Sequence, residues 1–478
     1  MQAELIVKLK AIVGGHGYRE TTADLEPHLT EWRGLYKGST PLMLLPESTQ
    51  QVSEILHACA AAGAPIVPQG GNTGLAGGAI AGLDGGTEQI LLSTTRLNKV
   101  RAIDAANYTM TVEAGCILAE LHNAALEAER FFPLSLAAEG SCQIGGNIST
   151  NAGGTNVLRY GNTRDLVLGL EVVLPDGRIF SDLRALRKDN TGYDLKQLFI
   201  GAEGTLGVIT AATLKLFPVP RSTATAWLAI DSPASAISLY SSARSLLGDE
   251  LIAFELMPRI AIDMVVAHIP GCRDPLPDTD GWYVLLELAS AREQTAVDEQ
   301  VTEFLSASME RGWVQDGVVA SSDNQRHELW RVRHAISEAQ KSSGASIKHD
   351  ISVPVSSMAE FLLEADRLVA EQLPGIRPVS FGHLGDGNLH YNLSQPVDMA
   401  AADFLALWEP LNELVHGLAT RLGGSFSAEH GIGFLKAAEL ERLESKVKMD
   451  LMRTIKQAID PQGLMNPGKV LRKSHDDQ

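Results

Sequence analysis

The sequence has few cysteines, no long apolar run and no excess of basic residues, and each absence excludes a class of protein. Its four cysteines, Cys59, Cys116, Cys142 and Cys272, include no CxxC pair, which argues against a disulfide framework or a thiolate metal site. No stretch approaches the roughly 20 apolar residues of a membrane span, and the first residues lack the order of a secretory signal. We therefore expect no transmembrane segment and a cytoplasmic location. A formal net charge of −18 argues against nucleic acid as a partner.

The length of 478 residues is too great for one hydrophobic core. Strand-like and helix-like runs alternate, and two prolines near residue 218 indicate a linker. The pattern predicts an α+β protein whose second domain is an antiparallel sheet with helices on one side. We expect four segments, namely a helical lead-in at 1–35, a cofactor-binding domain at 36–216, a substrate domain at 217–417 and a C-terminal helical segment at 418–478 that completes the site.

Glycine-rich stretches at 68–78, 139–154 and 201–210 are the first functional signal. Glycine lets backbone N–H groups approach a ligand closely, and consecutive N–H groups can bind phosphate oxygens. The stretches match neither the dinucleotide GxGxxG motif nor a P-loop. Any one of them alone could be a flexible connection. Three together, each joined to predicted strands, favour one extended ligand such as a dinucleotide with a planar head group.

Residues 381–392 contain two histidines around an Asp-Gly pair. An Asp-Gly pair is typical of a two-residue hairpin turn, so we expect the turn at 386–387. Pairing outward from it places His383 opposite His390 on one face, with Cβ atoms about 5 Å apart. Asn392 falls on the same face as His390, because strands have a period of two. Two imidazoles so placed can bind one metal, whereas the alternative is a glycine-rich loop with two surface histidines.

A second short segment, 427–433, places Glu429 and His430 in a glycine-flanked turn after a predicted helix. Glu429 could be a third metal ligand. His430 could be a general base, because the ordinary pKa of histidine lies near neutral pH. An ordinary helix terminus is the alternative.

Cationic residues of the second domain suggest a substrate carboxylate. The pattern predicts a helix over 327–340 that carries Arg333 and Ser337 on one face, and a strand over 347–353 that carries Lys348. Arg333 and Lys348 together could hold a carboxylate, the arginine with two hydrogen bonds. Without further support, an exposed helix face and a solvated strand face explain the same residues.

These motifs carry a resemblance to a known family. The glycine-rich segments, with 162–177 between them, resemble the FAD-binding domain of the vanillyl-alcohol oxidase and p-cresol methylhydroxylase flavoproteins. The segments 382–390, 427–431 and 466–469 are similar to motifs of the FAD-dependent D-2-hydroxyacid dehydrogenases in that class. The similarity is closest to the D-2-hydroxyglutarate dehydrogenase branch, with D-lactate dehydrogenases as near relatives.

The resemblance implies a two-subdomain FAD-binding domain, a substrate (cap) domain and a C-terminal segment that returns to the flavin. It places the FAD pyrophosphate on residues 70–74. Residues 68–80 contain no histidine or cysteine that could bond the flavin, so we expect non-covalent FAD. The implied FAD-binding residues are Pro68, Gly70, Gly71, Asn72, Thr73, Gly74, Gly77, Gly78, Glu139, Gly140, Ser141, Gly145, Gly146, Ser149, Thr150, Asn151, Gly153, Gly154, Glu203, Gly204, Gly207, Ile209 and Asn466.

The resemblance also implies roles for the second-domain residues. A divalent metal, expected to be zinc, would bind His383, His390 and Glu429. His430 would take the hydroxyl proton of the substrate. Where the hydroxyglutarate branch commonly has threonine, this sequence has serine at position 337. The implied substrate-binding residues are Arg333, Ser337, Lys348, Asn392 and His430.

The implied reaction is oxidation of a D-2-hydroxy acid, with D-2-hydroxyglutarate converted to 2-oxoglutarate and D-lactate and D-malate as alternatives. The sequence contains no motif of a second redox centre, so an external acceptor is expected, either an electron-transfer flavoprotein or a quinone. A homodimer is left open. Two alternatives of another kind are a metallohydrolase that uses His383, His390 and Glu429, and a catalytically inactive FAD-binding protein.

Overall fold

A computed structural model describes residues 3–83 and 88–472 of the chain. Residues 1–2 and 473–478 of the predicted lead-in and C-terminal segment lie outside the described ranges. The chain divides into two compact units, the first formed by residues 1–154, 162–219 and 429–478 and the second by 155–161 and 220–428. The predicted four-segment division itself stays a prediction. Within the described ranges, no helix combines the length and the apolar character that crossing a bilayer requires.

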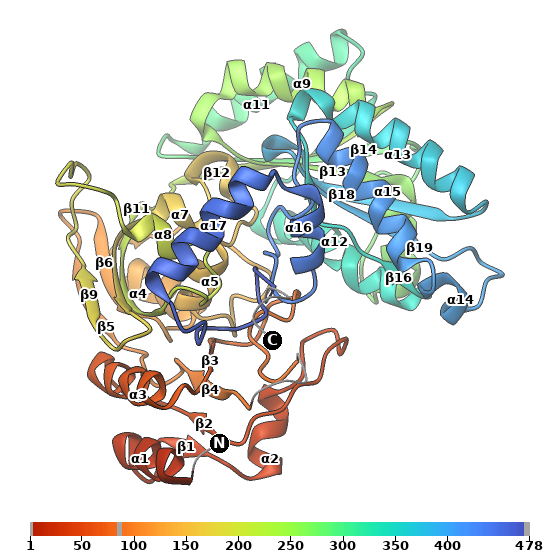
Figure 1. Cartoon of the computed structure of the whole chain (residues 1–478). Helices are drawn as coiled ribbons and strands as arrows, with labels where there is room; N and C mark the ends of the chain where they lie inside the picture. Colours follow the sequence, from red (N-terminus) through yellow and green to blue (C-terminus); the bar gives the residue numbers. More distant parts are fainter. Residues whose placement is uncertain (1–2, 84–87, 473–478) are drawn as a thin grey trace. The chain divides into compact units, whose positions relative to one another are not determined.

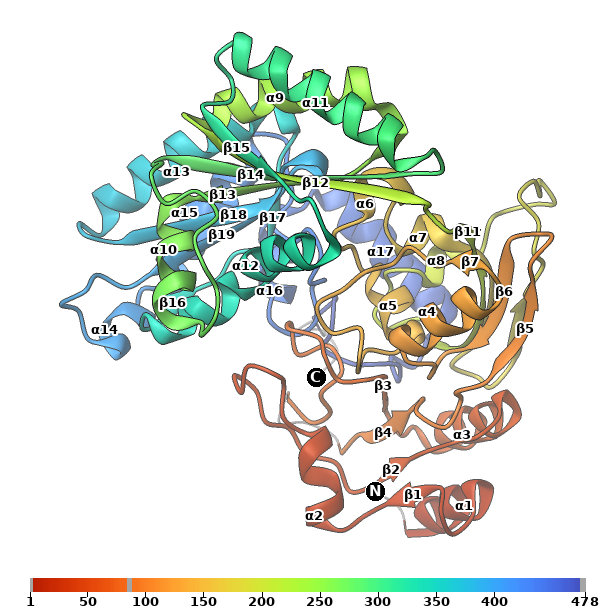
Figure 2. The same ribbon diagram turned by 180° about the vertical axis from the view of Figure 1, so that it is seen from behind.

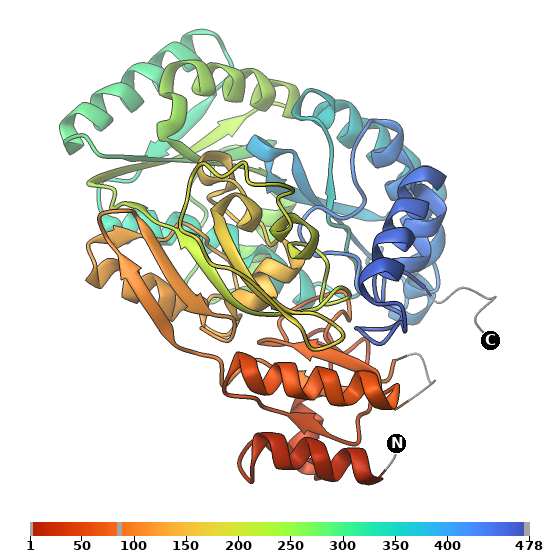
Figure 3. The same ribbon diagram turned by 60° about the vertical axis from the view of Figure 1, so that its left-hand side comes forward.

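The N-terminal part of the first unit is a small sheet covered by helices (Figure 1). Its elements are α1 (Ala3–Val13), β1 (Tyr18–Arg19), α2 (Thr22–Leu25), η1 (Glu26–His28), β2 (Met43–Leu44), α3 (Thr49–Ala62), β3 (Ile66–Gln69) and β4 (Ile90–Ser93). The strand order is β1–β2–β4–β3, with β2 and β3 parallel to β4. Helix α3 begins where the Ser48 side chain accepts the N–H of Gln51. Helices α1 and α3 lie side by side and share a core that includes Leu9 and Ile55 (Figure 3).

The rest of the first unit is an antiparallel sheet in the order β5–β6–β10–β8–β9. The strands are β5 (Val100–Asp104), β6 (Thr109–Glu113), β8 (Val167–Val173), β9 (Ile179–Asp182) and β10 (Val208–Lys215). Further elements are α4 (Leu118–Glu127), β7 (Arg130–Phe131), α5 (Ile144–Thr150), α7 (Thr163–Leu166), α8 (Lys196–Phe199), β11 (Phe217–Pro218), α16 (Ala437–Leu443) and α17 (Lys446–Ile459). The C-terminal segment returns to this unit, where the Asn466 N–H donates to the Ile66 carbonyl at 2.8 Å.

The second unit is built on one large antiparallel sheet in the order β15–β12–β14–β13–β18–β19–β16, with β17 also paired to β19. Its elements are α6 (Val157–Tyr160), β12 (Ser222–Ile230), α9 (Pro233–Leu247), η2 (Gly248–Glu250), β13 (Leu251–Pro258), α10 (Arg259–His268), β14 (Trp282–Ser290), α11 (Gln294–Glu310), β15 (Asp316–Val319), α12 (Asp323–Ser342), β16 (Ser346–Ile347), β17 (Ile351–Ser352), η3 (Val355–Ser357), α13 (Met358–Gln372), β18 (Arg377–His383), η4 (Leu384–Asp386), β19 (Asn388–Ser394), α14 (Ala401–Leu405) and α15 (Trp408–Arg421).

Helices cover both faces of this sheet, so the expectation of helices on one side is wrong (Figure 2). The reason is visible in β12, whose alternating residues are apolar on both faces. Ala226 and Leu228 pack in the core that contains α9, α11 and α13. Trp227 and Ala229 pack in a separate core with α10 and α12. The second core places α12, which carries Arg333, directly against the sheet.

Candidate active site

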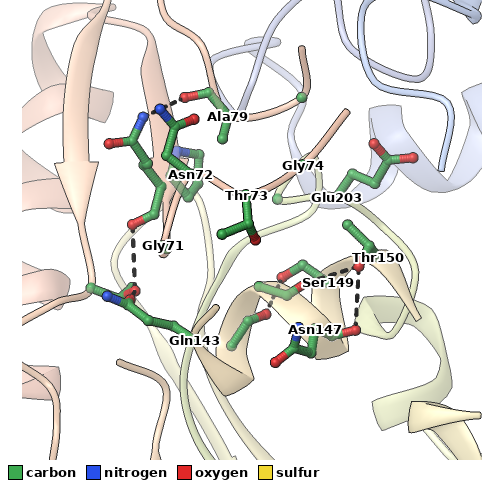
Figure 4. Close-up of a pocket in the computed structure, with 18 of the residues that line it drawn as sticks. Gly71, Asn72, Thr73, Gly74, Ala79, Gln143, Asn147, Ser149, Thr150 and Glu203 are labelled. Atoms are coloured by element: carbon green, nitrogen blue, oxygen red, sulfur yellow. Dashed lines mark hydrogen bonds between the residues drawn. The ribbon is translucent and has the colours of Figure 1, made fainter. Parts of the chain in front are cut away.

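A pocket in the first unit is lined by all three glycine-rich stretches (Figure 4). Five consecutive backbone N–H groups, from residue 70 to residue 74, have no acceptor within the described part of the chain. Asn72 has a positive φ of 53°, which turns successive N–H groups toward one side. These features fit an anionic ligand that accepts several backbone hydrogen bonds, as a pyrophosphate does.

The pocket keeps its shape because its loops approach one another closely. A side chain on Gly71 would clash with the Ser141 carbonyl oxygen, and one on Gly145 would overlap Ala114. A Cβ on Gly74 or Gly146 would meet nothing within 4 Å. The first pair of glycines therefore serves packing between loops, whereas the second pair leaves open space on the pocket side.

The Ser149 and Thr150 hydroxyls of α5 also line this pocket, and both donate to helix carbonyls, of Gly145 at 2.7 Å and of Gly146 at 3.1 Å (Figure 4). Among the residues that the structure describes, the buried Oδ1 atom of Asn147 has no hydrogen-bond partner, although this side chain lies at the pocket wall. An unpaired buried acceptor is costly, so it is consistent with a ligand donor at this place.

Fifteen of the residues implied to bind FAD line the pocket, and eight do not. The lining residues are Pro68, Gly70, Gly71, Asn72, Thr73, Gly74, Gly78, Gly145, Gly146, Ser149, Thr150, Glu203, Gly204, Gly207 and Ile209. The other implied residues are Gly77, Glu139, Gly140, Ser141, Asn151, Gly153, Gly154 and Asn466. The individual contacts to FAD stay predictions for both groups.

The turn that carries His430 is held by the pocket loops. Glu203 accepts the N–H of Ile432 at 2.7 Å with one carboxylate oxygen and the N–H of Gly433 at 2.8 Å with the other. The carbonyl of Ala76 accepts two further N–H groups of the same turn, from residues 434 and 435. His430 itself lines the pocket. Binding of a ligand by the glycine-rich loops and placement of His430 therefore depend on the same contacts.

The Glu203 carboxylate and the two N–H groups that it accepts, from Ile432 and Gly433, are called the Glu203 clamp. Burial raises the pKa of Glu203, and the two backbone N–H groups and the Lys436 charge oppose that rise. Asn466 strengthens the same region, because its Nδ2 donates to the carbonyls of Gly78 at 2.9 Å and of Glu203 at 2.7 Å. Asn466 thus supports the pocket from behind rather than lining it.

In the second unit, β18 and β19 bring the two predicted histidines together. The rings of His383 and His390 lie 5.8 Å apart between centroids and are nearly perpendicular, at 76°. The predicted register is wrong, because His390 pairs with Phe381 instead of His383. The shift is two residues, and a shift of two keeps side chains on the same face of a sheet. The shared face of the two histidines was therefore predicted correctly.

The turn itself explains the shift. Residues Leu384–Asp386 form a 3₁₀ turn, and Gly387 follows with φ +84°. The Asp386 side chain accepts the N–H of Asn388 at 3.1 Å. Asp386 therefore closes the turn with its side chain, as aspartate often does, and does not serve as the first residue of a two-residue hairpin loop.

Glu255 of β13 is a site residue that sequence reasoning missed. It pairs across strands with His383, and its Oε1 lies 2.6 Å from His383 Nδ1. Its Oε2 accepts from Arg333 Nε at 2.8 Å and Nη2 at 2.7 Å. Burial alone would raise the pKa of Glu255, but the charges of His383 and Arg333 and their hydrogen bonds outweigh burial and lower it to about 2. A lone glutamate in the apolar stretch 251–258 was the available signal.

The implied substrate-binding residues lie near one another in the second unit. Lys348 Nζ lies 3.5 Å from the Ser337 carbonyl oxygen, one helical turn after Arg333 on α12. Arg333 is buried, and its guanidinium lies 4.8 Å from the Phe381 ring. Asn392 is buried on β19 and donates to Gln340 of α12 at 3.0 Å. Lys348 falls between the short strands β16 and β17, where one continuous strand was predicted.

Glu429 begins the chain segment that belongs to the first unit, one peptide bond after Ala428. The Ala428 N–H donates to the Asp350 carbonyl at 3.2 Å, and Asp350 Oδ1 accepts from Asn388 Nδ2 at 3.0 Å. Asn388 is two residues from His390. The chain immediately before Glu429 is thus anchored close to the histidine hairpin.

Comparison with known proteins agrees with this geometry. The model of an "FAD binding domain" family matches residues 40–182, and that of "FAD linked oxidases, C-terminal domain" matches residues 219–470. The mitochondrial D-2-hydroxyglutarate dehydrogenase of Arabidopsis thaliana is 40% identical over 470 residues, which cover 97% of this chain and 81% of that protein. The D-2-hydroxyglutarate dehydrogenase of Xanthomonas citri pv. viticola is 39% identical over 98% of this chain and 97% of that protein.

A solved structure of p-cresol methylhydroxylase with substrate bound has the same fold, with a TM-score of 0.78 over 98% of this chain and 96% of that chain, at 15% identity. The predicted fold class is thereby confirmed. The chain belongs to the FAD-linked oxidase family, together with the D-2-hydroxyglutarate dehydrogenases, and is an FAD-dependent oxidoreductase of the D-2-hydroxyacid dehydrogenase type.

Proposed function

We propose that this chain oxidises a D-2-hydroxy dicarboxylate at a metal-assisted flavin site, with D-2-hydroxyglutarate converted to 2-oxoglutarate as the best candidate. The names of the two relatives support the substrate. The observation that carries the proposal is the pair of histidines on one face of the β18–β19 hairpin, 5.8 Å apart between ring centroids. The metallohydrolase alternative gives the flavin pocket no role.

The donor set fits a divalent metal, expected to be zinc. Glu255 Oε1 holds His383 at Nδ1, so Nε2 is the ring atom left to act as a ligand, and a divalent metal bound there would take the place of the second ring proton. His383, His390 and Glu429 would hold the metal. Two histidines and one carboxylate leave coordination positions open, and a 2-hydroxy acid can fill them with its hydroxyl and carboxylate oxygens.

The chain's own residues would bind and deprotonate the substrate. When bound, FAD supplies the hydride acceptor and the metal lowers the pKa of the substrate hydroxyl. His430 accepts the hydroxyl proton, since it lines the flavin pocket in a turn held by Glu203. Asn392 and Ser337 contribute polar contacts to the substrate. Lys348 and Arg333 bind the distal carboxylate, which D-lactate lacks.

Lys348 gives the cleaner test of the distal carboxylate, because Arg333 lies in a buried ion pair and its removal would also destabilise the fold. We expect Lys348→Ala to raise the KM for D-2-hydroxyglutarate at least tenfold and to change the KM for D-lactate by less than threefold. Ser337→Thr, which restores the side chain common in the hydroxyglutarate branch, is the matched control and should keep both values near wild type. Equal losses for both substrates would contradict the dicarboxylate assignment.

The partner and location predictions also remain proposals. The electrons would leave through an external acceptor, an electron-transfer flavoprotein or a quinone. A homodimer and the cytoplasmic location stay predictions, and the Arabidopsis relative is named mitochondrial.

The proposed function is tested by anaerobic reduction of the bound flavin with a panel of D- and L-2-hydroxy acids. D-2-hydroxyglutarate should bleach the flavin at the lowest concentration, ahead of D-malate and D-lactate, and the L-acids should not. Metal analysis of the same sample should find one divalent ion per chain, and His383→Ala should lose it. A metal-free, fully active enzyme would end the metal assignment, and a protein that no hydroxy acid reduces would favour a catalytically inactive flavoprotein.

A further inference from the structure

The two oxygens of the buried Glu255 carboxylate contact two different functional side chains. Its side chain is 1% exposed, in the middle of a strand that is otherwise apolar. Oε1 lies 2.6 Å from His383 Nδ1 of β18, and Oε2 accepts from Nε and Nη2 of Arg333 on α12, at 2.8 and 2.7 Å. A buried charge with three short hydrogen bonds has little freedom to move, so the three side chains form one rigid unit.

The two ends of this group of three side chains have different functions. At one end, the bond to Nδ1 fixes the His383 tautomer and ring orientation, which leaves Nε2 for a metal. At the other end, Nε and Nη2 of Arg333 are occupied, which holds the guanidinium over Phe381 at 4.8 Å. Arginine has five N–H donors, so the others stay available for a substrate carboxylate. The same Phe381 ring lies 5.1 Å from the His390 ring.

We propose that Glu255 is a positioning residue that couples metal binding at His383 to recognition of the substrate's distal carboxylate at Arg333. This inference rests on the proposed function, because it takes His383 as a metal ligand and Arg333 as a substrate contact. Beyond the proposed function, the orientations of His383 and Arg333 depend on each other through Glu255. Loss of the Glu255 charge would release His383 and Arg333 together, whereas loss of an ordinary structural glutamate would release neither.

Glu287 offers a matched control in the same unit. It is also buried, in the neighbouring strand β14, and accepts from Thr225 Oγ1 and Trp330 Nε1, both at 2.6 Å. Trp330 lies on α12, three residues before Arg333. Glu287 therefore fastens the same helix to the same sheet, and these two hydrogen bonds involve neither His383 nor Arg333. Glu287→Gln removes the same charge and keeps the same shape as Glu255→Gln.

The experiment measures Co²⁺ binding and substrate preference on FAD-loaded protein. Co²⁺ affinity is determined by competition with a chelator and by the visible spectrum of the bound ion. Glu255→Gln should weaken Co²⁺ binding by about 10–100-fold and shift the spectrum. At saturating Co²⁺ it should also raise the KM for D-2-hydroxyglutarate relative to that for D-lactate. Glu287→Gln should stay within about twofold of wild type in both, at a similar melting temperature.

Unchanged Co²⁺ affinity in Glu255→Gln, or an equal loss in Glu287→Gln, would overturn the inference and leave the proposed function intact. If wild-type protein binds no Co²⁺, the proposed metal centre fails and the inference fails with it. Should Glu255→Gln not fold, Glu255→Asp is measured in the same way. Its carboxylate is one methylene shorter and cannot reach both partners, so we expect either the Co²⁺ affinity or the KM ratio to change. Wild-type values for both would overturn the coupling.

Discussion

The Glu203 clamp gives a prediction whose size can be worked out from the structure. The Glu203 carboxylate accepts the N–H of Ile432 at 2.7 Å and that of Gly433 at 2.8 Å. In Glu203→Gln one oxygen becomes an NH₂ group, which places a donor against a donor. The turn loses one hydrogen bond, worth about 0.5–1.5 kcal/mol, and an N–H is left unpaired at about 1–3 kcal/mol.

We therefore expect the turn that carries His430 to open more easily, by about 2–4 kcal/mol after partial relaxation. Since about 1.4 kcal/mol corresponds to a tenfold change in an equilibrium constant, amide hydrogen exchange at residues 431–433 should rise by about 30-fold or more. The turnover number at saturating FAD should fall with it, because His430 would spend less time in place. Exchange in α3, far along the sequence, should not change.

Glu129→Gln is the matched control. Glu129 also has a positive φ, 56° against 51° for Glu203, but its side chain is exposed. The same chemical change there should leave exchange and turnover at wild-type values. Unaltered exchange at 431–433 in Glu203→Gln, with normal FAD content, would refute the clamp. So would an equal increase in the Glu129 variant.

Three further predictions concern the thiols, the flavin linkage and one buried acid. In native FAD-loaded protein, Cys272 should be the one cysteine that reacts with a disulfide reagent at pH 8, because the other three are buried. Burial also raises the pKa of Cys59 to about 12 and that of Cys116 to about 11, which keeps these thiols protonated. Rapid reaction of more than one thiol before unfolding would contradict this. Acid precipitation should leave the yellow flavin in the supernatant, and flavin found in the pellet would mean a covalent bond. Burial raises the pKa of Asp366 and the hydrogen bond from the Tyr391 hydroxyl opposes the rise, so wild type loses stability as pH rises above the ordinary value of 3.8. Asp366→Asn should therefore gain melting temperature relative to wild type as the pH is raised from below 3.8 to neutral, and a constant or falling difference over that whole range would contradict that sign.

Elements that depend on neighbouring residues could be predicted from the sequence. The Ser48 cap of α3 and the tight connection between β8 and β9 depend only on neighbouring residues, so features of this kind can be recognised in the sequence. The glycine-rich stretches also predicted a ligand site, because glycine itself leaves the backbone N–H groups accessible to a ligand, and all three stretches line the pocket. What the sequence could not give was the length of the turn at 384–387, since the Asp386 side chain closes it.

Long-range partners were beyond sequence reasoning. Glu255 reaches His383 over 128 positions, and the Glu203 contact to Ile432 spans 229 positions. The residues alone left Arg333 either as a carboxylate ligand or as part of an exposed helix face, and its buried pairing with Glu255 could not be read from helix periodicity. Pairings of this kind depend on which strands become neighbours, and β13 meets β18 through a sheet order that has no local signature.

The most direct test of the account is anaerobic titration of the purified, metal-loaded protein with D-2-hydroxyglutarate, followed by flavin absorbance. We expect complete bleaching with one substrate oxidised per flavin. Bleaching should be lost after metal removal and should recover when a divalent ion is restored. Full bleaching that persists in metal-free protein, or no bleaching by any D-2-hydroxy acid, would contradict a metal-assisted flavin dehydrogenase.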